Sequence, residues 1–368
     1  MTAHSAIVMN ADTGAILFEK QAYVPAYPAS ITKIATALYI LDQKKPLMNQ
    51  MVTVSGEALK MKNPKNLKEA PSYWQESDGS SMRILKGEVL SVEALLHGLM
   101  LVSGNDAANA LAVFLSGSVP AFLEEMNAYI RNLGCKNTQF SNPHGLHHPE
   151  HFTTAYDICL ITKKALQIPK FREIVSKETY LKPKTNKQPQ GEIENFNSLI
   201  KPGRHYYSKA IGVKTGFHSA AKSTLVAAAE HEGRTLIAVL LGCEKKASRY
   251  VEATRLFEAA FAEQKEKRRL LGPENIFTQE VPGSKTLLHA ALTKELAIEF
   301  FPAEEPECKA ALHWNFPPLP IRKGQKVGEI RVLDAEQRLL QKGDLIALQE
   351  IKGSFLLTLR EMFVKFFE

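Results

Sequence analysis

Three short motifs that stand far apart in this chain constrain its fold more than any other feature of the sequence. They are S-I-T-K at residues 30–33, S-G-N at residues 103–105 and K-T-G at residues 214–216. Together they supply the groups of a serine acyl-transfer site, so the fold has to bring the three segments together. S-x-x-K or S-x-N alone occurs by chance about once or twice in a chain of this size, and K-T-G about 0.1 times. A single motif is therefore weak evidence for such a site, and the order of the three motifs and the elements on which they are predicted to lie make the combination specific.

The first motif is predicted to lie in the first turn of a helix. Behind it, apolar residues repeat at helical spacing, at Ile34, Ala35, Ala37, Leu38 and Leu41. The backbone N–H of Ser30 would then point out of the helix end, where it could donate to a developing oxyanion. Lys33 would fall on the same face and reach the Ser30 hydroxyl. For this motif alone, a helix N-cap followed by a solvated lysine is the favoured alternative.

A lysine base requires a special environment. With an ordinary pKa near 10.4, lysine is a poor proton acceptor at neutral pH. The site would have to lower the pKa of Lys33 by burial or by a neighbouring cation. Lys214 could be that cation, and a desolvated lysine near another positive charge is a known way to activate a nucleophile.

The second motif is predicted to lie on a turn between two helices. From that turn Ser103 could relay a proton between Lys33 and the leaving amine. The Asn105 amide could bond both the lysine and the substrate amide. For this motif alone, an ordinary turn with an asparagine N-cap is about equally favoured.

The third motif is predicted to lie on the edge of a β-strand. There Lys214 and Thr215 could bind a substrate carboxylate. Gly216 would let an extended peptide lie close to that edge, because it has no side chain. The backbone N–H of Phe217 would be the second oxyanion donor.

The rest of the sequence predicts two domains and a terminal helix, and the length of 368 residues agrees with two domains. We expect a β-hairpin over residues 6–18, helices over 92–100, 107–115, 122–133, 156–166 and 249–267, and strands over 210–216, 223–228 and 235–241. The composition shifts at Gly272, and short β-like runs continue to about Ile351. Residues 354–368 place their apolar side chains on one helical face. The predicted boundaries are 1–268 for the first domain, 273–351 for a small all-β domain and 354–368 for the amphipathic helix.

The net charge of +7 favours an anionic partner, which could be a membrane surface, a carboxylate-bearing polymer or a nucleic acid. A surplus of solvated lysines explains the charge about equally well. Because no nucleic-acid-binding motif is visible, we expect no nucleic-acid partner.

The cysteines and histidines are not spaced for a metal. The four cysteines form no C-x-x-C pair. Four histidines cluster at 144, 147, 148 and 151, but Pro143, Gly145 and Pro149 disfavour a helix that would align them. We therefore expect no metal and no cofactor.

Longer blocks around the motifs resemble a known family. P-A-S-I-T-K at 28–33, L-V-S-G-N-D-A-A at 101–108, T-T-A-Y-D at 153–157 and G-V-K-T-G at 212–216 closely resemble the low-molecular-mass penicillin-binding proteins that act as D-alanyl-D-alanine carboxypeptidases. The resemblance extends through P-I-R-K-G-Q-K-V-G at 320–328. It implies an α/β catalytic domain of DD-peptidase/β-lactamase type, with an antiparallel sheet and helices. A small β-sandwich-like domain and a C-terminal amphipathic membrane anchor would follow. Arg249 resembles the family arginine that helps to hold the substrate carboxylate.

The resemblance also implies a reaction. Ser30 would attack the penultimate D-Ala carbonyl of a peptidoglycan stem peptide, the terminal D-Ala would leave, and water would hydrolyse the acyl-enzyme. β-Lactam antibiotics would acylate the same serine. The expected location is extracytoplasmic, in the periplasm, on the outer face of the inner membrane. The sequence begins without the charged and apolar regions of a signal peptide, so the chain would be a mature form with an added methionine or else cytosolic.

Several alternatives stay open. A class A β-lactamase would need an E-x-x-L-N stretch, which the sequence lacks. A DD-endopeptidase would use the same site on cross-linked peptides. A catalytically silent cell-wall-binding protein is kept open by His218, which stands where the family usually has threonine. The loop over residues 61–80 looks longer than in the family, and the terminal helix could instead pack on its own domain.

Overall fold

The computed structural model describes residues 1–63 and 69–354. The chain forms two compact units, one over Met1–Ala262 and the second from Glu263 onward. The helix predicted over residues 249–267 is too long, because α7 spans Ser248–Phe261 and residues Glu266–Leu271 form strand β10. The division between the units therefore precedes the boundary that we predicted at residue 268.

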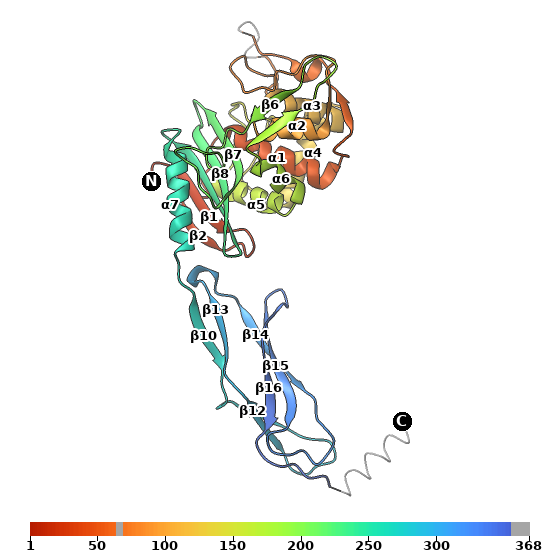
Figure 1. Ribbon diagram of the computed structural model, residues 1–368, viewed down its shortest axis with the longest axis vertical. Coiled ribbons are helices and arrows are strands. Elements are labelled where there is room, and N and C mark those ends of the chain that lie inside the picture. Colours follow the sequence, from red (N-terminus) through yellow and green to blue (C-terminus); the bar gives the residue numbers. More distant parts are fainter. Residues whose placement is uncertain (64–68, 355–368) are drawn as a thin grey trace. The chain divides into compact units, whose positions relative to one another are not determined.

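A five-stranded antiparallel sheet forms the centre of the first unit, with the strand order β2-β1-β9-β8-β7 (Figure 1). Its strands are β1 (Ser5–Asn10), β2 (Ile16–Lys20), β7 (Ala210–His218), β8 (Lys222–His231) and β9 (Arg234–Cys243). The predicted hairpin at the N-terminus and the predicted antiparallel pair formed by β8 and β9 are confirmed. Because β7 ends the order, its outer edge is free of a neighbouring strand within this sheet.

Helices cover both faces of this sheet, so its central strands are buried on both sides. Residues of β9 alternate between two cores: Ile237 and Val239 belong to one, Leu236 and Ala238 to the other. Helix α7 covers the second core. The first core packs against α1 (Lys33–Tyr39), α2 (Val92–Met100), α3 (Asn105–Ser116), α4 (Val119–Asn132), α5 (Ala155–Leu166) and α6 (Pro169–Ser176).

Side-chain caps fix where several of these helices begin. Ser91, Ser118 and Thr154 each accept a hydrogen bond from the backbone N–H three residues later. Short elements complete the unit: the 3₁₀ turns η1 (Ala29–Thr32) and η3 (Glu57–Leu59), the π-helical turn η2 (Ile40–Lys44), and the pairs β3 (Met51–Thr53) with β4 (Val89–Ser91) and β5 (Thr179–Lys182) with β6 (Gly191–Glu194).

No single helix among the described residues has both the length and the apolar composition to cross a bilayer, although α3 and α4, bent by 87°, meet both criteria as a pair.

In its described part, residues 263–354, the second unit is built of β-strands with one short 3₁₀ turn, as the predicted all-β domain requires. Strands β10 and β13 (Leu296–Phe300) form one antiparallel pair. A five-stranded sheet has the order β11-β12-β16-β15-β14. Its strands are β11 (Ile276–Gln279), β12 (Leu288–Leu292), β14 (Cys308–Trp314), β15 (Lys326–Asp334) and β16 (Leu339–Ala347), and η4 spans Pro302–Glu304. The unit has its own apolar core, which includes Leu288, Val327 and Leu345. Residues 355–368 of the predicted terminal helix lie outside the described residues.

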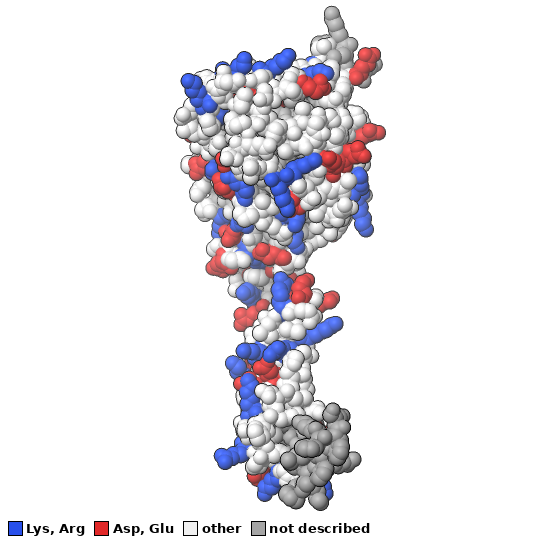
Figure 2. Space-filling view, turned by 90° about the vertical axis from the view of Figure 1, so that its right-hand side faces the viewer, with Lys and Arg blue, Asp and Glu red and all other residues white. Residues whose placement is uncertain are grey.

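On the face shown in Figure 2, basic and acidic side chains are interspersed over both units. This face therefore fits the interpretation that many of the excess lysines are ordinary solvated residues.

Candidate active site

The first two motifs meet at the amine of Lys33. Ser30 lies in η1, directly before α1, and Lys33 is the first residue of α1. The Lys33 side chain is fully buried, and its Nζ lies 3.1 Å from Ser30 Oγ and 2.8 Å from Asn105 Oδ1. A third contact, of 2.6 Å, joins Nζ to the backbone carbonyl of His144. Lys33 is therefore not the solvated lysine of the alternative interpretation.

The surroundings of Lys33 favour its neutral form. Burial lowers the pKa of Lys33 well below its ordinary value, and the positive charge of Lys214 lowers it further. The carboxylate of Asp106 acts in the opposite direction. The site thus meets the condition that the sequence set for a lysine base.

Ser103 lies on the turn between α2 and α3, as predicted. It adopts a left-handed backbone conformation with φ +63°, which is rare for residues other than glycine. Its hydroxyl is buried and has no hydrogen-bond partner among the described residues. Asn105 is the first residue of α3, and the N-cap is Gly104. The interpretation of Asn105 as an ordinary N-cap is therefore wrong, and its amide oxygen binds Lys33 instead.

The third motif lies on β7, the edge strand, beside Ser30. A Cβ atom added at Gly216 would lie 3.0 Å from the Ser30 backbone nitrogen and 2.4 Å from Thr224 Oγ1, so only glycine allows this approach. The Lys214 side chain is buried, and its Nζ donates to the Thr215 carbonyl at 3.2 Å. Burial and then the charge of Arg249 lower the pKa of Lys214 to about 7.

Arg249 and Phe217 also border the site. Arg249 comes from α7 and is buried; its guanidinium donates to the Gly216 carbonyl at 2.9 Å and to the Thr224 carbonyl at 3.2 Å. It therefore holds the backbone of β7 and β8 in addition to facing the cleft. The Phe217 side chain is exposed, with Lys246 Nζ 4.7 Å from the ring centroid.

A cleft of about 620 Å³ connects these groups. Of the predicted site residues, it is lined by Ser30, Ser103, Asn105, Thr215, Gly216, Phe217 and Arg249. The lysines Lys33 and Lys214 lie buried beneath this lining. The lining also includes Lys201, Lys246, Glu76 and Asp78, which the sequence did not indicate. Glu76 and Asp78 come from the loop that looked longer than in the family.

Asp106 anchors the segment directly after that loop, and the three motifs did not single it out. Its carboxylate accepts hydrogen bonds from the backbone N–H groups of Met82, at 2.9 Å, and Ile84, at 3.0 Å, and from the Ser81 hydroxyl, at 2.6 Å. Because Asp106 follows Asn105 directly, this segment is fixed next to the residue that binds Lys33. The signal in the sequence was the aspartate of L-V-S-G-N-D-A-A.

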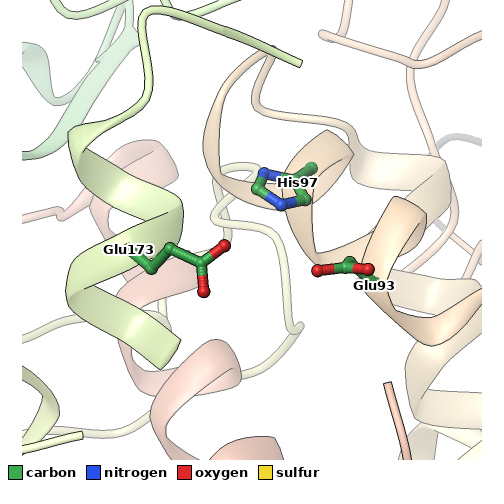
Figure 3. Close-up of side chains that lie close together, drawn as sticks. All are labelled: Glu93, His97 and Glu173. Carbon is green, nitrogen blue, oxygen red and sulfur yellow. The ribbon is translucent and has the colours of Figure 1, made fainter. Parts of the chain in front are cut away.

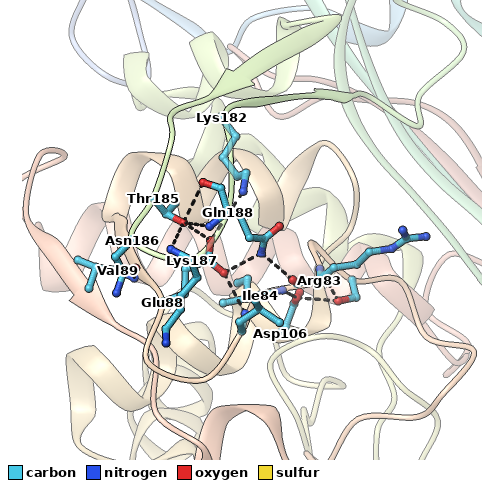
Figure 4. A network of polar contacts seen from close by, with 12 residues as sticks. Arg83, Ile84, Glu88, Val89, Asp106, Lys182, Thr185, Asn186, Lys187 and Gln188 are labelled. Atoms are coloured by element: carbon cyan, nitrogen blue, oxygen red, sulfur yellow. Dashed lines mark hydrogen bonds and ion pairs between the residues drawn. The ribbon is translucent and has the colours of Figure 1, made fainter.

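Glu88 extends this network to the hairpin of β5 and β6 (Figure 4). Its buried carboxylate accepts from the Leu85 N–H at 2.9 Å, the Thr185 hydroxyl at 2.7 Å and the Gln188 amide at 2.8 Å. Burial alone would raise the pKa of Glu88, but these hydrogen bonds lower it overall. The Glu88 carboxylate thus stays charged and joins the hairpin to the segment that follows the cleft-lining loop.

The histidine loop supports Ser30 and Lys33. A Cβ atom at Gly145 would lie 2.0 Å from the Ala29 carbonyl oxygen, and Gly145 has φ +92°, so this position requires glycine. His151 Nε2 lies 2.8 Å from Thr32 Oγ1, and its Nδ1 accepts from the Ser141 N–H. Burial lowers the pKa of His151 to about 3. Burial likewise lowers the pKa of His144, whose Nδ1 accepts from the Leu146 N–H at 3.2 Å. Both histidines therefore brace the backbone as neutral rings.

Comparison with known proteins gives the same description for the matching family and for a similar curated protein. The sequence pattern of a family described as D-alanyl-D-alanine carboxypeptidase matches residues 1–245. The chain is 30% identical over 366 residues to D-alanyl-D-alanine carboxypeptidase DacF of Bacillus subtilis, covering 97% of this chain and 87% of the relative.

Similar solved structures support the predicted fold. Penicillin binding protein 5 from Haemophilus influenzae has a TM-score of 0.64 at 28% identity, covering 96% of this chain and 98% of the other. The Streptomyces K15 DD-transpeptidase has a TM-score of 0.62 at 30% identity, covering 71% of this chain and 98% of the other. The predicted DD-peptidase fold with an all-β second unit is thereby confirmed.

The close approach at Gly216 gives a test of this packing. We expect Gly216→Ala to lower the free energy of unfolding of the first unit by about 1–3 kcal/mol, because the methyl group overlaps Thr224 and crowds Ser30. Gly191→Ala is the matched control, since nothing lies within 4 Å of its added Cβ; its effect should stay within about 0.5 kcal/mol. Urea unfolding in a Trp314→Phe background, where Trp74 is the remaining tryptophan, would measure both. Equal effects of the two substitutions would contradict the packing described for Gly216.

Three observations agree. They are the motif geometry, the family match over residues 1–245, and the likeness to the B. subtilis relative along nearly the whole chain. The resemblance inferred from the sequence is confirmed. The chain belongs to the D-alanyl-D-alanine carboxypeptidase family of serine peptidases.

Proposed function

We propose that the protein removes the terminal D-alanine of peptidoglycan stem peptides through an acyl-enzyme on Ser30. The observation that carries this proposal is the position of the Lys33 amine, buried and 3.1 Å from Ser30 Oγ. The names of the relatives support the substrate, a peptide ending in D-Ala-D-Ala, and the name of the H. influenzae neighbour supports acylation by penicillin-type β-lactams.

The contacts of Lys33 explain how it would act as a base. A neutral amine has two N–H bonds and one lone pair. The Asn105 amide oxygen and the His144 carbonyl can only accept, so they take the two N–H bonds. The lone pair then remains for the third neighbour, the Ser30 hydroxyl. Ser30 gives its proton to Lys33 as its oxygen attacks the penultimate D-Ala carbonyl.

The remaining groups have complementary roles in this proposal. The backbone N–H groups of Ser30 and Phe217 stabilise the oxyanion. The Ser103 hydroxyl passes the proton from Lys33 to the leaving D-Ala amine, so that the C–N bond breaks as the N–H bond forms. Lys214, Thr215 and Arg249 receive the terminal carboxylate of the substrate. Water then hydrolyses the ester on Ser30, releasing the shortened peptide.

We expect Ser30→Ala to reduce D-alanine release from diacyl-Lys-D-Ala-D-Ala by at least about 10³-fold, because the variant has no nucleophile. Assay of released D-alanine beside the unaltered protein would measure this. Thr13→Ala, which changes a hydroxyl residue in the β1–β2 turn, is the control and should keep full activity. Undiminished release by Ser30→Ala would refute the acyl-enzyme. Absence of release by the folded unaltered protein would favour the endopeptidase or the silent binding protein.

The two buried lysines predict a bell-shaped pH profile of kcat/KM. Activity should rise with pH as Lys33 loses its proton, and fall as Lys214 loses its proton, because neutral Lys214 no longer attracts the substrate carboxylate. The falling limb is expected near the Lys214 pKa of about 7. In Lys214→Arg the cation persists, so this limb should move to higher pH. An unchanged falling limb in that variant would exclude Lys214 as its origin.

We also propose that residues 354–368 bind a membrane surface and that the protein works outside the cytoplasm. The sequence supports the first part, because the apolar residues of this segment fall on one face of a helix. The proposed substrate supports the second part, because peptidoglycan stem peptides belong to the cell wall, outside the cytoplasm. Deletion of residues 354–368 should abolish flotation of the purified protein with anionic liposomes, while D-alanine release in solution stays intact. Unchanged flotation would contradict the anchor.

A further inference from the structure

A second group of ionisable side chains lies between α2 and α6. Glu93 and His97 are one helical turn apart on α2, and Glu173 projects from α6. Ligand atoms of the three side chains lie within 4.8 Å of one another. Figure 3 shows the carboxylates of Glu93 and Glu173 converging on the His97 ring from the two helices.

His97 is the unusual member of this group. It is fully buried, and neither ring nitrogen has a hydrogen-bond partner among the described residues. Its ring stacks on Tyr180, with the centroids 3.9 Å apart and the planes at 11°. A buried polar nitrogen without a partner is costly, and packing against Tyr180 would be served as well by an apolar ring. The nitrogens of His97 therefore suit a ligand.

Burial keeps the His97 ring in its uncharged form. Burial lowers the pKa of His97 to about 4, an effect strengthened by Lys177 and Lys170 and opposed by Glu93 and Glu173. At neutral pH the ring is uncharged, so one nitrogen can donate its lone pair to a cation.

The two carboxylates already share a cation. Lys170 Nζ lies 2.5 Å from Glu93 Oε1 and 3.0 Å from Glu173 Oε2. Lys177 Nζ also contacts Glu173, at 3.1 Å. The Lys170 side chain is one quarter exposed, so it has a path to solvent. An ammonium ion binds the carboxylates but not the imidazole, whereas a metal ion can bind all three.

We propose that Glu93, His97 and Glu173 bind a divalent first-row transition metal ion, with Zn²⁺ the best fit, in competition with the Lys170 ammonium. One imidazole and two carboxylates are ligands that Zn²⁺ accepts, and they leave a fourth position for water. The site is separate from the acyl-transfer chemistry and does not depend on it.

The site would connect two elements that support the active site. Helix α2 ends at Met100, shortly before Ser103. Helix α6 packs against β7, where a Cβ atom at Gly212 would lie 3.0 Å from the Val175 side chain. A bound ion would therefore fix the helix before the second motif to the helix beside the third motif, and raise the melting temperature of the first unit.

His97→Phe gives the decisive test, because it keeps the ring on Tyr180 and removes both nitrogens. Untagged, chelator-treated full-length protein is titrated with ZnCl₂ by isothermal calorimetry, and melting temperatures are recorded with and without Zn²⁺. We expect one Zn²⁺ per chain in the unaltered protein, and at least tenfold weaker binding in His97→Phe and in Glu173→Gln. Lys170→Met should bind Zn²⁺ more tightly, since the competing ammonium is gone.

Glu124→Gln, which changes an exposed carboxylate on α4, is the control and should bind Zn²⁺ like the unaltered protein. The proposal is overturned if His97→Phe binds Zn²⁺ as tightly as the unaltered protein does, or if neither the unaltered protein nor Lys170→Met binds it. A cooperative melting transition of His97→Phe in the absence of metal shows that the variant is folded, and so separates a lost site from a lost fold.

Discussion

The amine of Lys33 is the point on which the active site depends. Segments that are distant in the sequence contribute Ser30, Asn105 and the His144 carbonyl, and all three contact one nitrogen atom. Burial of a lysine is unfavourable as long as it carries a charge, and the site resolves this by favouring the neutral amine. The burial that disfavours a charged Lys33 therefore also leaves its neutral amine able to accept a proton.

Close backbone approaches fix the geometry around that nitrogen. Gly216 lets the edge of β7 lie against the Ser30 backbone, and Gly145 lets the histidine loop lie against Ala29. Arg249 reaches from α7, on the other face of the sheet, to hold the Gly216 carbonyl. The cleft is thus built on the backbone of a packed sheet, where small displacements are costly.

Buried carboxylates hold the segment that follows the cleft-lining loop. Asp106 secures the backbone of Met82 and Ile84, and Glu88 joins that segment to the β5–β6 hairpin. Each carboxylate accepts several hydrogen bonds, which offset the cost of burying its charge. The group formed by Glu93, His97 and Glu173 differs, because its histidine has no such partner among the described residues. That contrast distinguishes a structural ionic network from a site that suits a ligand.

Local patterns in the sequence determined much of this protein. The three motifs identified the residues that line or underlie the cleft, and the periodicity of α1 and the β8–β9 pair predicted their structure correctly. The sequence also indicated the change to an all-β second unit near Gly272. It misjudged the end of α7, because the charged run over residues 263–269 has no apolar stripe to distinguish a helix from strand β10.

Only the tertiary structure decided how these residues work. The His144 carbonyl has no signature in a sequence, because every residue has a backbone carbonyl. The second role of Arg249, holding Gly216 and Thr224, and the anchoring roles of Asp106 and Glu88 depend on partners that are distant along the chain. The depressed pKa of Lys33 likewise arises from burial and from Lys214. Local residue patterns determine elements and candidate chemistry, whereas burial, charge proximity and hydrogen bonding between distant segments exist only once the chain has folded.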